Sequence, residues 1–86
     1  MEIKKKVVMR TVAGETMLIP VGDTTAEYNG LFTLSPSAAT AFAVLQNGGD
    51  ENDALNAVLG EFDIDRETAE NDLNEFLSSL KEFNII

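Results

Sequence analysis

Two apolar runs rich in β-branched residues stand near the start of the chain, and a glycine-containing turn separates them. Residues 7–12 hold three valines and a threonine, and residues 16–21 hold a threonine, an isoleucine and a valine. Such residues are favoured in strands, and the Ala-Gly-Glu segment between the runs is typical of a hairpin loop. A third short apolar run follows a polar segment. The pattern therefore predicts three strands, over residues 7–12, 16–21 and 30–34.

After residue 35 the apolar positions recur at the three- and four-residue spacing of amphipathic helices. Ser35 followed by Pro36 is a favoured helix start, and Asn47 with two glycines after it is a favoured helix end. Asp50 and Asp65 are expected to cap two further helices. The predicted helices cover residues 36–46, 51–62 and 66–83. One face of the third is strongly apolar and consists of Ala69, Leu73, Phe76, Leu77, Leu80 and Phe83.

The strands precede the helices without mixing, which favours the α+β class. We expect a three-stranded antiparallel N-terminal sheet followed by three helices. At 86 residues the chain has the length of one domain, so residues 1–86 are predicted to form a single domain. Ile85 and Ile86 end the chain on two apolar side chains, which we expect to dock on the core.

Charge is unevenly distributed along the chain. The net charge is −9, and from residue 11 onward two cations (Arg66 and Lys81) face 14 carboxylates, a net charge of −12. An acidic body repels nucleic-acid phosphates and anionic lipid headgroups, and it attracts basic peptides. No apolar run approaches the roughly 20 residues of a membrane span, and the first ten residues hold too short an apolar stretch for a signal peptide. We therefore expect a cytoplasmic protein that binds neither nucleic acid nor membrane.

Several kinds of chemistry lack their usual residues. The chain has no cysteine and no histidine, which removes thiolate nucleophiles, the commonest general base and the commonest zinc ligands. A calcium loop starting at Asp50 would place Leu55 where the turn requires glycine, so that pattern fails. We assign no catalytic residue, no metal and no cofactor, and we expect a binding protein that is not an enzyme.

Three segments of the chain together match the pattern of a known family. The first is Leu-Ser-Pro-Ser-Ala-Ala at residues 34–39, with an aromatic residue, Phe42, one helical turn later. The second is the acidic segment 50–65. The third is Phe-Leu-Ser-Ser-Leu at residues 76–80, followed by Asn-Ile-Ile at residues 84–86. Together these segments resemble the PqqD-like family of precursor-peptide recognition elements. Ser35, Phe42 and Asn84 stand where that family usually has asparagine, tryptophan and glycine.

The resemblance implies a winged helix-turn-helix-like fold and a non-catalytic role in natural product biosynthesis. In that family the leader segment of a ribosomally made precursor peptide adds as a strand beside the third sheet strand, against the third helix. The implied partners are this precursor peptide and a separate peptide-modifying enzyme, for which a radical SAM maturase is one candidate. The domain would act as a peptide chaperone that presents the precursor for post-translational modification.

The residues themselves are compatible with that mode of binding. The run 30–34 is short, apolar and preceded by a polar segment, as expected of an unprotected sheet edge. Asp72 and Glu75 on the third helix would attract a lysine or arginine, whereas Phe76 is also explained by ordinary core packing. The candidate peptide-binding residues are Gly30, Leu31, Phe32, Thr33, Leu34, Asp72, Glu75, Phe76, Ser79 and Phe83.

Two other functions are compatible with the order of the elements. A winged-helix nucleic-acid-binding regulator would share the helices, although its recognition helix normally carries lysine and arginine toward the phosphates. A self-associating interaction domain would pair its exposed edge with a second copy. We expect a monomer or a weak dimer.

Overall fold

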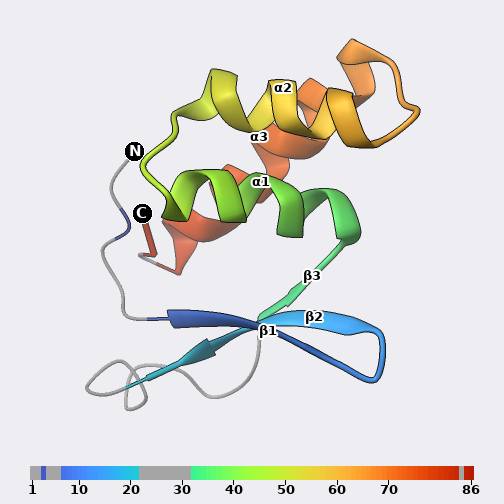
Figure 1. Cartoon of the computed structure of the whole chain (residues 1–86). Coiled ribbons are helices and arrows are strands. Elements are labelled where there is room, and N and C mark those ends of the chain that lie inside the picture. Colours follow the sequence, from blue (N-terminus) through green and yellow to red (C-terminus); the bar gives the residue numbers. More distant parts are fainter. Residues whose placement is uncertain (1–2, 4–6, 22–31, 84) are drawn as a thin grey trace.

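Among the described residues, three strands come first along the chain and three helices follow them. The computed structural model describes residues 3, 7–21, 32–83 and 85–86. Its elements are β1 (Val7–Val12), β2 (Glu15–Pro20), β3 (Phe32–Leu34), α1 (Pro36–Gln46), α2 (Glu51–Glu61) and α3 (Arg66–Glu82). The helices lie together on one face of the antiparallel sheet (Figure 1). The predicted α+β class, with the sheet N-terminal to the helices, is confirmed.

The hairpin between β1 and β2 turns on two residues. Ala13 and Gly14 have φ angles of 53° and 83°, and positive φ at both central positions is what a type I′ hairpin turn requires. Val12 therefore pairs directly with Glu15. The second strand begins one residue earlier than the predicted run 16–21, because the loop is one residue shorter than the predicted Ala-Gly-Glu turn.

The sheet has the order β1-β2-β3, so β2 is central and β3 is an edge. Leu34 of β3 pairs with Thr16, and Phe32 pairs with Leu18. Within the described residues β3 is three residues long, against the predicted run 30–34. Residues 30 and 31 of that prediction lie outside the described residues.

Each helix begins at the cap that its sequence supplies. The Ser35 hydroxyl accepts a hydrogen bond from the Ala38 N–H at 3.2 Å. The Asp50 carboxylate accepts one from the Asp53 N–H at 2.9 Å, and the Asp53 carboxylate accepts one from the Asp50 N–H at 3.1 Å, which makes a reciprocal capping box. Asp65 caps α3 through the Thr68 N–H at 3.3 Å. These bonds satisfy amides that no helical carbonyl reaches.

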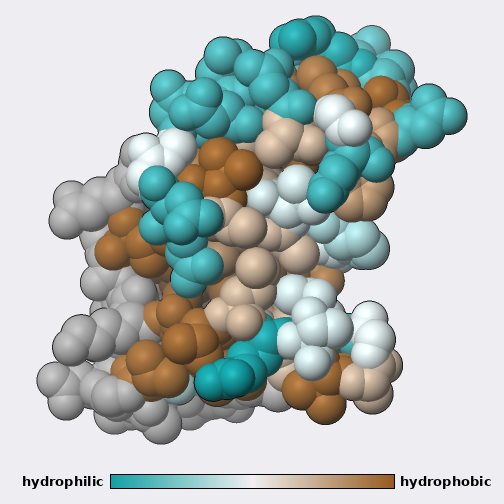
Figure 2. Space-filling view, viewed as in Figure 1, coloured by the Kyte–Doolittle hydropathy of each residue, from teal (hydrophilic) through white to brown (hydrophobic). Residues whose placement is uncertain are grey.

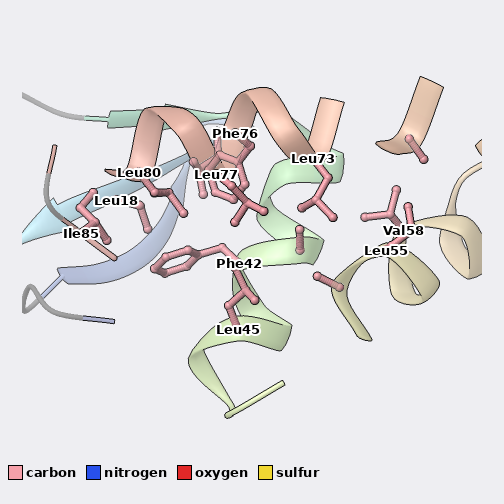
Figure 3. Packing of buried hydrophobic residues seen from close by; sticks show 14 of the residues in the cluster. Leu18, Phe42, Leu45, Leu55, Val58, Leu73, Phe76, Leu77, Leu80 and Ile85 are labelled. Atoms are coloured by element: carbon pink, nitrogen blue, oxygen red, sulfur yellow. The ribbon is translucent and has the colours of Figure 1, made fainter. Parts of the chain in front are cut away.

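The core lies between the sheet and the helices. The largest fully buried side chains are Phe42, Leu18, Leu45, Leu80 and Ile85. The ring of Phe42 points toward Leu18 and Ile85 (Figure 3), and it meets the ring of Phe76 edge-on, with centroids 6.3 Å apart and an interplanar angle of 75°. The core therefore joins the central strand, α1, α3 and the chain end in one apolar cluster.

The end of α3 corrects one prediction. Phe83, expected on the buried face of this helix, is its C-cap and is 48% exposed. The Ile85 N–H donates to the Leu80 carbonyl at 2.8 Å, a bond typical of the Schellman motif, and Ile85 is fully buried. At this end of α3, Ile85 and not Phe83 thus belongs to the buried core. The expected docking of Ile85 and Ile86 on the core is confirmed.

Candidate functional site

A cavity of about 470 Å³ opens beside the edge strand β3, between α1 and α3. We call it the edge pocket. Its apolar members come from β3 and all three helices, and most of them are buried: Leu34, Ala38, Ala41, Val58, Ala69, Leu73 and Phe76. Its polar members are Thr33, Ser35, Ser37, Asp72, Glu75 and Ser79. The volume is within the usual range for ligand pockets, about 300–1,000 Å³.

Small side chains make the floor of the edge pocket concave. Ala38 and Ala41 project from α1, and Ala69 projects from α3. An alanine side chain ends at Cβ, so these positions leave space that leucine would fill. Phe76, which is 8% exposed, supplies an aromatic wall that packs on the core through Phe42. The floor thus offers apolar surface to a side chain from outside.

The rim of the edge pocket is polar, and its charges have one sign. Asp72 and Glu75, both exposed, stand on α3, and no cation is among the lining residues. They are three residues apart, which places them on neighbouring positions of one helix face. Figure 2 shows polar side chains covering α2 as well, above the small and apolar residues of α1. The pocket therefore combines an apolar floor with an acidic rim.

Within the described residues, the backbone of β3 has hydrogen-bonding groups without a partner next to this pocket, and the register of the hairpin shows which groups these are. In a two-residue hairpin the residues flanking the loop, here Val12 and Glu15, form a hydrogen-bonded pair, and hydrogen-bonded and non-hydrogen-bonded pairs then alternate. Thr11 and Thr16 are therefore a non-hydrogen-bonded pair. The 2.9 Å contact between their hydroxyls agrees with the closer side chains of such pairs.

It follows that Thr16 and Leu18 direct their N–H and C=O groups away from β1 and toward β3. Their partners in β3 are Leu34 and Phe32. Between these, the N–H and C=O of Thr33 point away from β2, toward the open edge. Ser35 cannot extend this edge as a strand, because its carbonyl accepts the Ala39 N–H of α1 at 2.9 Å. Among the described residues of β3, Thr33 is thus the one with both backbone groups available at the edge.

The structure brings together most of the residues that the sequence nominated. Six of the ten candidates line the edge pocket, and these are Thr33, Leu34, Asp72, Glu75, Phe76 and Ser79. Phe83 does not line it. Gly30 and Leu31 lie outside the described residues, and for Phe32 the description is limited to its place in β3.

The sequence interpretation missed the contribution of α1 and α2. Ser37, Ala38 and Ala41 of α1 and Val58 of α2 all line the pocket. The available signal was the Ala38–Ala41 spacing of three residues, which places two small side chains on one helix face. Small residues at this spacing also occur where helices simply pack closely, so the spacing alone did not identify a pocket.

Two carboxyl groups have perturbed acidity, and both are helix caps. Hydrogen bonds, first of all from the Asp53 N–H, lower the pKa of Asp50 below its ordinary value of 3.8. Hydrogen bonds from the hydroxyl and N–H of Thr68 lower the pKa of Asp65 in the same way. A carboxylate that accepts such bonds is stabilised in its charged form. These shifts reflect helix capping and do not indicate a general acid or base.

In the described part of the chain, no group of three or more His, Cys, Asp or Glu side chains is arranged to hold a metal ion. None of the helices described is both long enough and apolar enough to cross a membrane.

Comparison with known proteins gives one family and one structure. The sequence profile of a family described as "Coenzyme PQQ synthesis protein D (PqqD)" matches residues 15–86. A solved structure described as "TbiB1 in Complex with the TbiA(beta) Leader Peptide" is similar, with 25% sequence identity and a TM-score of 0.74. The match covers 99% of this chain and 93% of that one. No curated protein sequence matched the chain.

Proposed function

The chain belongs to the PqqD family, and from that premise we propose that it binds the leader segment of a ribosomally made precursor peptide. The observation that carries the proposal is the position of the edge pocket directly beside the open edge of β3. The structurally similar TbiB1 is in complex with a leader peptide, which supports the same class of ligand for this chain.

The peptide adds to the sheet as a fourth strand next to β3. Strand addition uses backbone hydrogen bonds for a grip that is independent of sequence, and pockets for alternate side chains give selectivity. Thr33 exchanges hydrogen bonds with one peptide residue, whose side chain lies on the Thr33 face of the sheet. The two peptide residues on either side of it project to the opposite face, where Leu34 is buried, and enter the edge pocket.

The pocket contributes more selectivity than the backbone. A net hydrogen bond contributes about 0.5–1.5 kcal/mol, and the described part of β3 has a single residue with both groups free at the edge. Full burial of one leucine-sized side chain contributes about 1.5–3 kcal/mol. The side chains that reach Ala38, Ala41 and Phe76 therefore decide which peptides bind tightly.

The bound peptide is presented to a separate modifying enzyme, for which a radical SAM maturase is one candidate. In this role residues 1–86 act as one binding domain and contribute no catalytic group. The effect on the reaction is proximity, because a tethered substrate has a raised effective concentration at the enzyme. The domain acts as a monomer or weak dimer, since pairing of two β3 edges would occupy the site that the peptide needs.

Titration of the isotope-labelled protein with its cognate leader peptide, followed by amide chemical shifts, tests the proposal. We expect the largest shifts at Thr33, Leu34 and the Asp72–Ser79 stretch of α3. Shifts that avoid these residues and appear at β1 would overturn strand addition at β3. Sedimentation of the free protein at several concentrations checks that the β3 edge is not already paired with a second copy.

A further inference from the structure

The charges around the edge pocket restrict the chemistry of its occupant. We propose that the peptide carries a lysine or arginine at a position that faces the pocket, and that its cationic group binds between Asp72 and Glu75. This inference rests on the proposed function, because it names the class of peptide that the same site selects.

The two carboxylates have no counter-charge in the described structure. Neither Asp72 nor Glu75 takes part in an ion pair among the described residues, in which the one ion pair joins Arg66 to Glu70 at 3.6 Å. Lys81, like Arg66, is not among the residues that line the pocket. Two like charges three residues apart on a helix repel one another, so a cation between them is favourable. A peptide cation would supply the missing charge.

The arrangement of apolar floor and acidic rim fits a long cationic side chain better than other side chains. Lysine and arginine lay their methylene stems along apolar surface and keep the charged group at the water-exposed end. Here the stem would contact Ala38 and Phe76, and the charged group would reach the exposed rim. A short apolar side chain would leave both carboxylates without a partner, and an acidic one would be repelled.

The register of strand addition limits where this cation stands in the peptide. The residue that pairs with Thr33 directs its side chain away from the pocket, and its two neighbours in sequence direct theirs into it. The cation therefore occupies one of these two neighbouring positions. The expected peptide pattern has a lysine or arginine and an apolar residue two positions apart.

Selection of peptides on the full chain tests this pattern without knowledge of the natural ligand. Random peptides displayed on phage would be selected on the immobilised protein at low salt, and the binders resynthesised. We expect lysine or arginine two positions from an apolar residue. Replacing that lysine by norleucine, which keeps the stem and removes the charge, should weaken binding about fivefold, as the loss of an exposed ion pair allows. High salt should shrink the difference.

Variants of the protein provide the reciprocal test. Asp72→Asn with Glu75→Gln should reduce the affinity of the lysine peptide about fivefold and leave the norleucine peptide unchanged. The matched control is Glu67→Gln with Glu82→Gln, which removes two charges from the same helix at positions that do not line the pocket. Equal losses in both double variants would mean that only net charge matters, and they would overturn the inference.

The possible results distinguish a failure of the cationic preference from a failure of the proposed peptide binding. If the selected peptides shift the Thr33 amide and bind equally well with lysine, norleucine or glutamate, strand addition holds and the cationic preference is wrong. If no selected peptide perturbs Thr33 or α3, the proposed function fails and the inference fails with it. If Asp72→Lys with Glu75→Lys selects peptides with aspartate or glutamate at the same position, the inference is supported directly.

Discussion

The two edges of the sheet differ in length and in what lies beside them. The β1 edge is six residues long, and the β3 edge is three residues long within the described chain. The longer edge has more backbone groups to offer, yet β1 contributes no residue to the edge pocket, whereas Thr33 and Leu34 of β3 both line it. Arg10 is exposed on β1, while Asp72 and Glu75 stand beside β3.

An open strand is therefore not by itself a selective binding site. An unpaired edge accepts any chain of suitable shape, which is a hazard as much as a function. At β3 the edge is short and the neighbouring helices form a cavity, so side chains decide the outcome. At β1 the exposed Arg10 discourages pairing, because charged residues are a common means of blunting an edge.

The largest expected effect concerns the core that supports both edges. Phe42→Ala removes a side chain that is 0% exposed and should cost about 3–5 kcal/mol of unfolding free energy. Stability totals of about 5–15 kcal/mol make such a loss severe, so both edges should lose their amide protection. Chemical denaturation measures the cost. Phe83→Ala is the comparison variant, and at 48% exposure it removes less buried surface, so it should cost less unfolding free energy than Phe42→Ala.

A larger side chain in the edge pocket should weaken peptide binding at the β3 edge, because only this edge adjoins the pocket. Ala38→Leu places a larger side chain on the half-exposed floor, and peptide binding should weaken about 10- to 100-fold because one ligand side chain loses its burial. Ala43→Leu is the control, since Ala43 is a half-buried α1 residue outside the pocket lining. Calorimetric titration gives the affinities. Undiminished binding to Ala38→Leu would show that the peptide does not use this pocket.

A proline substitution removes one outward N–H from either edge, so the same change can be used to compare peptide binding at the two edges. Thr33→Pro deletes an N–H that points away from β2, and Thr11→Pro deletes its counterpart on β1. Loss of one hydrogen bond of about 0.5–1.5 kcal/mol should weaken peptide binding roughly 2- to 10-fold for Thr33→Pro and leave it unchanged for Thr11→Pro. Equal losses of peptide affinity in the two variants would show that the peptide does not prefer the β3 edge to the β1 edge.

We expect a smaller effect of pH on the stability of α3, the helix beside β3. Asp65 caps this helix, and its pKa is lowered in the folded state, so its contribution to stability is present above pH 3.8 and is lost as the pH falls through the lowered pKa. Asp50 should behave alike for α2. Thermal unfolding between neutral and strongly acidic pH should show a falling midpoint. Asp65→Asn should flatten that slope, and an unchanged slope would contradict the capping account.

Local chemistry made much of the fold predictable, and long-range geometry made the rest unpredictable. The caps Ser35, Asp50 and Asp65 act on amides three residues away, so the sequence alone indicates where each helix starts. The two-residue turn was missed because Ala13 takes a positive φ that few non-glycine residues adopt. The outward position of Phe83 was missed because helical periodicity does not show where a helix stops.

Part of the site could be predicted from the arrangement of residues along the third helix. The family resemblance pointed to the third helix, and helical spacing then grouped Asp72, Phe76 and Ser79 on one flank. Glu75 was added for its charge, and these four residues line the edge pocket. The alanine floor depends on how α1 packs against α3, which no single segment encodes. The outward direction of the Thr33 backbone depends on the register of the sheet, and that register became evident only from the paired strands.

Amide hydrogen exchange at Thr33 and Thr11, measured with and without bound peptide, decides whether the peptide adds to β3. Both N–H groups point away from β2, so both should exchange readily in the free protein. Peptide addition at β3 predicts strong slowing at Thr33 and no change at Thr11. Slowing at Thr11 with no change at Thr33 would place the peptide on the other edge and contradict the account.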